Sequence, residues 1–274
     1  MTVIQSIILG IVQGLTEFLP ISSSGHLVIL PYLLNWDIPP RDAFIFDVLV
    51  QVATLIAVIA YFWSDLISIA RAMILGLKNK SPFVDAESRL GWFILLATIP
   101  AGGLGLVLKD TVELAFASLT ATAAALLLTA GLLVLAEKVG KRTRSLGEVT
   151  WKDAFWIGFF QVLAIFPGVS RSGATISGGM TRNLKRPSAA RFSFLMSVPI
   201  MLAAGVLAIL DLMQVQDLMS LLPVYIPGFI SAAVVGYLAI RWLIRYLGSH
   251  SLYVFAIYCT IVGLISLGLS LFVY

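Results

Sequence analysis

Three ionisable side chains interrupt two otherwise apolar stretches of this sequence. Glu17 and His26 lie in the first stretch, residues 3–33, and Arg171 lies in the second, residues 154–180. An ionisable group at the centre of a bilayer costs about 2.5 to 3.5 kcal/mol on insertion scales, so such residues are functional by default. A purely structural ion pair between Glu17 and Arg171 is the alternative, but it leaves the neighbouring serines and His26 without a role.

Serine- and glycine-rich turns at both interruptions are typical of helix starts that bind anions. The first N–H groups of a helix are unpaired and carry about half a positive charge, and hydroxyl groups and arginine suit phosphoryl oxygens. We therefore predict that both turns bind one phosphorylated group, although either segment alone could be a generic turn. The predicted substrate-binding residues are Ser22, Ser24, Gly25, Ser170, Ser172, Gly173 and Thr175. Asp47 and Gln51 are expected to line the site from a third side.

The charges of such a site do not balance without a cation. A lipid diphosphate brings about −2 to −3, against Arg171, two helix starts of about +0.5 each and the negative Glu17. We predict a divalent cation with oxygen ligands, Mg²⁺ or Ca²⁺, held by Glu17 and more weakly by Gln13, one helical turn away. A buried glutamine that only bonds the backbone is the alternative for Gln13.

The predicted catalytic residues are Glu17, Ser23, His26 and Arg171, and the sequence leaves the nucleophile open. Ser23 and His26 are three residues apart, which places them on one face of a helix. Ser23 could attack with His26 as its base, or His26 could attack phosphorus and form a phosphohistidine. Water could attack instead, with Glu17 or His26 as the base. A histidine that only caps a helix is a further alternative.

The composition places these residues in an all-α integral membrane protein. The 274-residue chain is 59% hydrophobic and 12% charged, whereas soluble domains are about 25% charged. Each half of the two interrupted stretches is too short to cross a bilayer, so we expect two re-entrant helical hairpins that are buried in protein or line a water-filled cavity. Six uninterrupted runs are long enough to be transmembrane helices: 44–63, 90–108, 114–136, 192–210, 221–240 and 252–272.

The distribution of lysine and arginine predicts the orientation. If both hairpins return to their own side, 15 of the 18 basic residues fall in the loops at 64–89, 137–152, 182–191 and 241–250. The opposite loops hold only Arg41 and Lys109. The basic loops should therefore be cytoplasmic and both termini should lie on the other side. Because the net charge of +4 reports orientation, we expect no nucleic-acid partner.

An internal repeat relates the two halves of this single membrane domain, residues 1–274. The two interruptions match at Gly10 and Gly158, at Gln13 and Gln161, and at the prolines and serines that follow. Each hairpin precedes three expected spans, and an odd number of crossings makes the halves run in opposite directions. We expect an inverted-topology repeat with units at roughly 1–137 and 150–274; chance similarity between apolar segments is the alternative.

The two motifs, residues 13–26 and 167–175, resemble those of the bacterial undecaprenyl-diphosphate phosphatase family, also called the bacitracin-resistance proteins. The resemblance implies a multi-pass inner-membrane hydrolase that converts undecaprenyl diphosphate to the monophosphate and phosphate, recycling the lipid carrier of cell-wall synthesis. It implies metal or proton chemistry at Glu17, phosphate binding at Arg171, and functional roles for Ser23 and His26. The family has Glu or Gln at the position of Gln13, so the glutamine here puts a second acidic metal ligand in doubt.

The resemblance also implies an active site that faces the periplasm. The expected partners are undecaprenyl diphosphate and membrane lipid, and a second copy of the chain is a further candidate. A transporter or flippase for a phosphorylated isoprenoid lipid is the alternative function, because inverted repeats with interrupted helices are a transport architecture. In that case Glu17 would be a coupling site and Arg171 a substrate clamp.

Overall fold

In the computed structural model, which describes residues 1–108, 118–213 and 218–272, every regular element is a helix. The expected all-α class is thereby confirmed for these residues. Lys109 and the first residues of the span expected at 114–136 lie outside them. In chain order the elements are α1 (Val3–Phe18), α2 (Ser23–Leu33), α3 (Pro40–Tyr61), α4 (Trp63–Lys78), α5 (Ala86–Val107), α7 (Leu119–Val139), a 3₁₀ turn (Leu146–Glu148), α8 (Trp151–Leu163), α9 (Arg171–Thr181), α10 (Arg186–Leu212), α11 (Leu218–Tyr246) and α12 (Tyr253–Phe272).

Five of the described helices are long and apolar enough to cross a bilayer, which makes the chain a multi-pass membrane protein. They are α3, α7, α10, α11 and α12. The sixth expected span corresponds to α5, whose 22 residues are sufficient in length but include Glu87 and Arg89 near its start and three glycines near its end. Glu87 and Arg89 precede the expected apolar run at 90–108, and the crossing of the bilayer by α5 stays a prediction.

Two pairs of short helices form hairpins where the sequence is interrupted. Helices α1 and α2 have 16 and 11 residues, and α8 and α9 have 13 and 11. At about 1.5 Å per residue, none of them reaches across a hydrocarbon core of about 30 Å. The turn of the second hairpin needs glycine, because Gly168 has a φ of +90° and an added Cβ would lie 2.5 Å from the Thr122 carbonyl oxygen.

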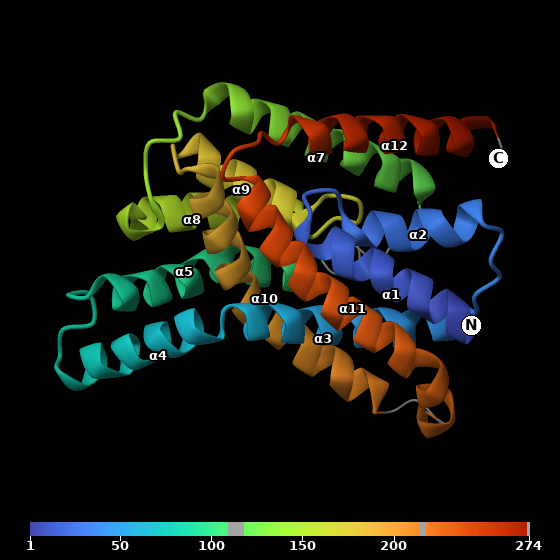
Figure 1. Ribbon diagram of the computed structural model, residues 1–274, viewed down its shortest axis with the longest axis horizontal. Helices are drawn as coiled ribbons and strands as arrows, with labels where there is room; N and C mark the ends of the chain where they lie inside the picture. The colour runs from blue at the N-terminus through green and yellow to red at the C-terminus, as the bar shows by residue number, and fades with distance from the viewer. Residues whose placement is uncertain (109–117, 214–217, 273–274) are drawn as a thin grey trace.

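The tips of the two hairpins contact each other in the middle of the molecule. The backbone N–H of Gly168 donates to Ser24 Oγ (3.2 Å), and Ser172 Oγ donates to the carbonyl oxygen of Leu19 (3.0 Å). In Figure 1 the turns meet between α1 and α2 on one side and α8 and α9 on the other. Residues about 150 positions apart in the sequence therefore share one site.

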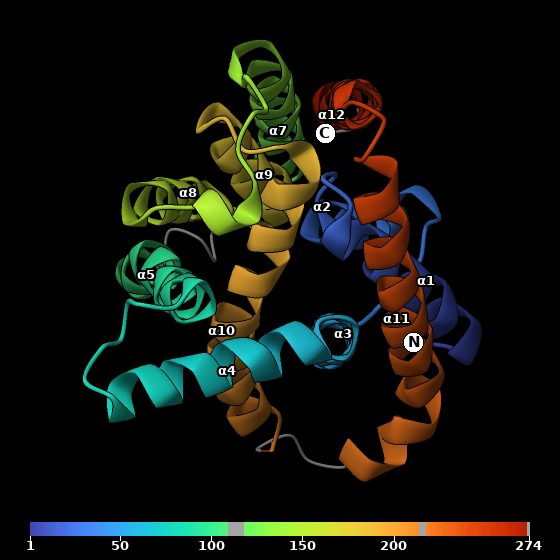
Figure 2. The ribbon, with the colours of Figure 1, turned by 60° about the vertical axis from the view of Figure 1, so that its left-hand side comes forward.

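Each hairpin packs against a helix from the other half of the chain. Helix α1 lies along α11, and α8 lies along α5, while α3 contacts α10 and α7 contacts α12 (Figure 2). The backbones approach closely at glycine: a Cβ on Gly10 would lie 2.2 Å from the Gly228 oxygen, and one on Gly158 would lie 2.5 Å from the Ala97 oxygen. Gly10 and Gly158 are the first matched pair of the expected repeat.

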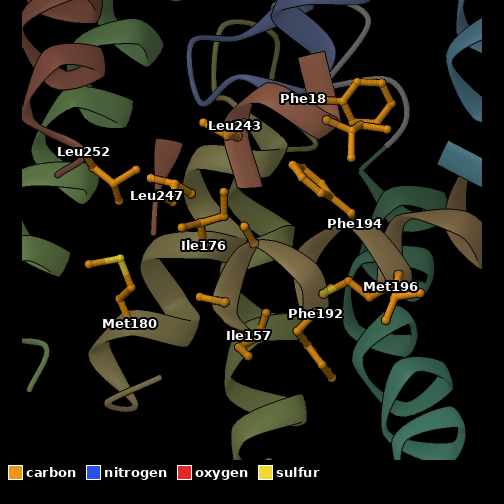
Figure 3. Close-up of a cluster of buried hydrophobic side chains, with 14 of the residues drawn as sticks. Phe18, Ile157, Ile176, Met180, Phe192, Phe194, Met196, Leu243, Leu247 and Leu252 are labelled. Carbon is orange, nitrogen blue, oxygen red and sulfur yellow. The ribbon is translucent and has the colours of Figure 1, made fainter. Parts of the chain in front are cut away.

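A tightly packed cluster of apolar side chains anchors the hairpins beside their tips. Figure 3 shows Phe18, Ile157, Ile176 and Phe194, which come from α1, α8, α9 and α10. All four are at most 1% exposed, and the rings of Phe18 and Phe194 meet edge to face at 5.5 Å. Because Phe18 follows Glu17 directly, this packing fixes the end of α1 that carries the carboxylate.

Helix α4 differs from the expectation of a loop at 64–89. It continues from α3 after a break at Phe62 and packs against α5. Apolar side chains such as Ile74 and Leu75 are exposed on it. A search for long apolar runs passes over such a helix, because its mixed composition resembles that of a polar loop.

The basic loops at 137–152 and 182–191 lie together at the end of the molecule opposite the N-terminus (Figure 1). They are joined through Asp153, whose fully buried carboxylate accepts hydrogen bonds from Arg144 (2.6 Å) and Arg182 (2.7 Å). Burial alone would raise the pKa of Asp153, but these hydrogen bonds and those from Thr150 hold the pKa well below its ordinary value. A second buried carboxylate, Glu137, pairs with two arginines in the same region.

Candidate functional site

A cavity of about 360 Å³ opens where the two hairpin tips meet. Its polar wall includes Glu17 from the end of α1, Ser23 from the start of α2, and Ser170 and Arg171 from the start of α9. Its apolar wall comes from the second hairpin turn, α5 and α10, and is formed by Ala101, Ala164, Ile165, Phe166, Ile200, Met201 and Ala204. The cavity therefore combines a charged end with an apolar flank.

The carboxylate of Glu17 is the centre of the polar wall. Its Oε1 accepts from Arg171 Nη2 (2.8 Å), and its Oε2 accepts from Ser23 Oγ (2.7 Å) and from Gln13 Nε2 (3.1 Å). The side chains of Glu17 and Arg171 are 11% and 19% exposed. The structure thus brings four of the predicted residues into one hydrogen-bonded cluster that borders a cavity.

Two capped helix starts face this cluster. Ser22, which has a φ of +70°, caps α2 by accepting from the N–H of Gly25 (3.3 Å). Ser170 caps α9 by accepting from the N–H of Gly173 (3.1 Å). Both helices point their partially positive ends toward the place where the hairpins meet, which is the arrangement an anion site requires.

The remaining predicted binding residues mainly hold the hairpins in place. Ser24 lines the cavity and accepts from the second hairpin turn. Ser172 and Thr175 are 3% and 1% exposed, and Thr175 Oγ1 donates to the Arg171 carbonyl (2.8 Å) and bonds Ser193 Oγ (2.6 Å). Ser172 and Thr175 do not line the cavity; Ser172 joins the start of α9 to the first hairpin, and Thr175 joins α9 to α10.

His26 is turned away from Ser23 and toward α12. Its Nδ1 lies 2.7 Å from the Ser22 carbonyl oxygen, and its Nε2 lies 2.7 Å from the hydroxyl of Tyr258. Because a carbonyl oxygen only accepts, Nδ1 carries the proton, and in the neutral ring Nε2 accepts from Tyr258. Within the described part of the chain, Ser23 and His26 share no hydrogen bond. The predicted Ser23–His26 pair is therefore not assembled in this arrangement, whereas Ser23 contacts Glu17.

Sequence reasoning missed three side chains that support the site. Tyr258 holds His26, Ser193 holds Thr175, and Thr129 accepts from the N–H of Ser170 (3.0 Å). Each lies in a long helix, where one hydroxyl among apolar residues has no distinguishing spacing. Only the tertiary contacts identify them.

A second cavity of about 290 Å³ adjoins the first and lies toward the N-terminus of the chain. Ser23, Ser24 and Gln51 line both cavities, and Asp47 lines the second, together with Gln13 and Trp36. Of the two residues expected on a third side, Gln51 therefore lines the cavity that holds Glu17 and Arg171, whereas Asp47 lines only the adjoining cavity.

The polar atoms that could hold a cation are few. No cluster of three or more histidine, cysteine, aspartate or glutamate side chains occurs within the described residues. The available oxygen donors are the Glu17 carboxylate and Gln13 Oε1, which is buried and has no hydrogen-bond partner in the part of the chain that the structure describes. Mg²⁺ commonly uses one or two protein oxygens and completes its shell with substrate phosphates and water, so this donor set fits such an ion.

Comparison with known proteins gives a consistent result along the chain. The family model described as bacitracin resistance protein BacA matches residues 6–265. The undecaprenyl-diphosphatase of Thermomicrobium roseum is 43% identical over 274 residues, covering 97% of this chain and 98% of the relative. The undecaprenyl-diphosphatase of Chloroherpeton thalassium is 44% identical, with 98% and 97% covered. That of Myxococcus xanthus is 40% identical, with 97% and 89% covered.

Proposed function

The chain belongs to the bacitracin resistance protein BacA family, and we propose that it hydrolyses undecaprenyl diphosphate to undecaprenyl phosphate and inorganic phosphate. This reaction returns the lipid carrier of cell-wall synthesis to use. The relatives named undecaprenyl-diphosphatase align over nearly the whole chain. One observation carries the assignment of residues: Glu17 accepts from both Ser23 and Arg171 at the wall of a cavity with an apolar flank.

The substrate binds with its diphosphate against Arg171 and its first isoprene units against the apolar wall. Arg171 stays bonded to Glu17 through Nη2. Its Nη1, buried and without a hydrogen-bond partner within the described ranges, is available to donate to a phosphoryl oxygen. The starts of α2 and α9 add partial positive charge. Ile200 and Met201 of α10 supply apolar surface for the isoprenoid.

Ser23 is the proposed nucleophile, and Glu17 is its base. The serine oxygen attacks the terminal phosphorus, the bond from that phosphorus to the bridging oxygen breaks, and undecaprenyl phosphate leaves. The proton of the Ser23 hydroxyl passes to Glu17 Oε2, to which it already donates at 2.7 Å. Water then attacks the phosphoserine phosphorus and the bond from phosphorus to the serine oxygen breaks. The serine oxygen takes its proton back from Glu17, and dihydrogen phosphate leaves with the water oxygen and both water protons. His26 positions the turn of α2 through Ser22.

A divalent cation, Mg²⁺ or Ca²⁺, is proposed to be held by Glu17 and Gln13. When bound, it would neutralise part of the diphosphate charge. The Oε1 of Gln13, buried and without a partner among the described residues, supports this role, because a buried unpaired acceptor beside a carboxylate favours a cation.

The proposed placement in the inner membrane has six crossings and two re-entrant hairpins that enter from opposite sides. The exchange of partners between halves, α1 with α11 and α8 with α5, supports an inverted repeat of residues 1–137 and 150–274. The basic loops at the end opposite the N-terminus support a cytoplasmic position for them. The termini and the site then face the periplasm, and a homodimer stays a prediction.

Phosphate release by the purified protein tests this function. We expect the wild type in detergent to release phosphate from undecaprenyl diphosphate in the presence of Mg²⁺ or Ca²⁺. In sealed vesicles, a flippase would instead move a labelled lipid phosphate between leaflets without cleaving it. Movement of the labelled lipid without phosphate release would contradict the proposed hydrolase function and favour a transporter.

A further inference from the structure

Gln161 is a buried polar side chain that no contact within the described residues explains. It lies near the end of α8, is 3% exposed, and lines the 360 Å³ cavity together with Glu17, Ser23 and Arg171. Neither its Nε2 nor its Oε1 has a hydrogen-bond partner. Burying an amide without partners is unfavourable, so such a group in a cavity wall indicates a ligand that completes its bonding.

The fold does not need Gln161 to hold α8 in place. The start of α8 is fixed by the buried Asp153 and its two arginines. Its middle is fixed by the close approach of Gly158 to Ala97 and by the fully buried Ile157. Removal of the Gln161 amide should therefore leave the helix where it is.

The surroundings of Gln161 specify a ligand with anionic oxygens. Arg171, in the wall of the same cavity, also has a buried donor, Nη1, that no described residue pairs with. Two unpaired N–H groups in one small cavity match the several acceptor oxygens of a diphosphate. Helix α8 ends at Leu163 beside the cavity, and its last carbonyls carry partial negative charge that repels an anion. A donor on that last turn offsets the repulsion.

Resting on the proposed hydrolysis, we infer that Gln161 is a further substrate-binding residue whose Nε2 donates to a phosphoryl oxygen of the isoprenyl diphosphate. Gln161 thereby completes a ring of donors that reaches the substrate from the second hairpin. Its counterpart in the first hairpin, Gln13, points its Nε2 at Glu17 instead. The two matched glutamines thus have different partners, one the carboxylate and the other the substrate.

Substitution Gln161→Met tests this inference, because methionine keeps the length of the side chain and removes both hydrogen-bonding groups. We expect KM for undecaprenyl diphosphate to rise about 10-fold to 100-fold, the effect of losing one hydrogen bond to a charged group, with kcat changed less than about threefold. The Tm of the purified protein should stay equal or rise. The increase in Tm that inorganic pyrophosphate gives the wild type should shrink. Gln5→Met is the control for KM and for the pyrophosphate response, because Gln5 lines neither cavity; its own Tm should fall slightly, since its Oε1 accepts from the Thr2 N–H at the start of α1.

The outcomes separate this inference from the proposed function. A wild type that releases no phosphate contradicts the function itself. An active wild type together with an unchanged KM and an unchanged pyrophosphate response in Gln161→Met overturns only the inference and leaves the amide to bind water. A Tm of Gln161→Met below that of the wild type would indicate that the Gln161 amide stabilises the fold. If the methionine variant does not fold, Gln161→Glu has the same shape and should weaken pyrophosphate binding by charge repulsion; unchanged binding in it would also overturn the inference.

Discussion

Replacing Arg171 by lysine should separate its two roles. The guanidinium reaches Glu17 with Nη2 at 2.8 Å and keeps Nη1 free for the substrate. A lysine ammonium is a single point charge on a flexible stem and cannot reproduce this fork. Arg171→Lys should therefore lose one charge-assisted hydrogen bond, worth about 1.5 to 3 kcal/mol.

That loss corresponds to a fall in kcat/KM of about 10-fold to 100-fold, since about 1.4 kcal/mol is tenfold. Arg171→Ala removes both contacts and leaves the Glu17 carboxylate without its counter-ion. Breaking a fully buried pair costs about 3 to 5 kcal/mol. The pair here is 11% and 19% exposed, which lowers that cost in stability slightly. Because Arg171→Ala also removes the positive charge and the donor to the substrate, we expect kcat/KM to fall at least about a hundredfold.

The assay is phosphate release from undecaprenyl diphosphate at several substrate concentrations. Arg191→Lys is the matched control, because Arg191 pairs with Asp65 in a more exposed position away from the cavity. We expect the control to have the kcat/KM of the wild type. A wild-type value in Arg171→Lys would refute the proposal that one guanidinium serves both Glu17 and the substrate.

Three further predictions concern His26, the cation and the basic loops. Tyr258→Phe removes the donor to His26 Nε2 and should lower kcat/KM about 2-fold to 10-fold by loosening the turn of α2; an increase would indicate that the freed histidine acts as a base. Chelation with EDTA should stop phosphate release and Mg²⁺ should restore it. The Gln13→Met variant should need a higher Mg²⁺ concentration than the wild type. Phosphate release that is insensitive to EDTA would contradict a role for a divalent cation. The stability that Asp153 contributes is complete above its unfolded pKa of 3.8 and is lost as pH falls below that value, because its folded pKa is lower. The Tm difference between the wild type and Asp153→Asn should therefore be large at pH 7 and should narrow near pH 3; a constant difference would contradict this linkage.

The sequence predicted the principal partners of the site because their residue types are costly in a membrane. Glu17 and Arg171 stand out as charges within apolar segments, and the serine-rich turns indicate helix starts. The internal repeat predicted that the two motifs share one site. The residue types and the serine-rich turns are local features of the chain, and the orientation depends on a count of basic residues in the loops.

The direction of the His26 side chain could not be predicted from spacing. A separation of three residues allows contact with Ser23, but Tyr258, 232 positions away, holds the ring on the other side. The same limit applies to the unpaired amide of Gln161, which resembles any glutamine in an apolar helix. Its significance comes from its place in the wall of the cavity that also holds Glu17 and Arg171.

The central claim is that the Ser23 hydroxyl, held by Glu17, attacks the terminal phosphorus. The most direct measurement is phosphate release by Ser23→Ala under single-turnover conditions, beside Ser24→Ala, whose hydroxyl accepts from Gly168 rather than contacting Glu17. We predict that Ser23→Ala loses at least about a thousandfold in rate while still binding pyrophosphate, and that Ser24→Ala loses far less. Phosphate release by Ser23→Ala at the wild-type rate would contradict the claim.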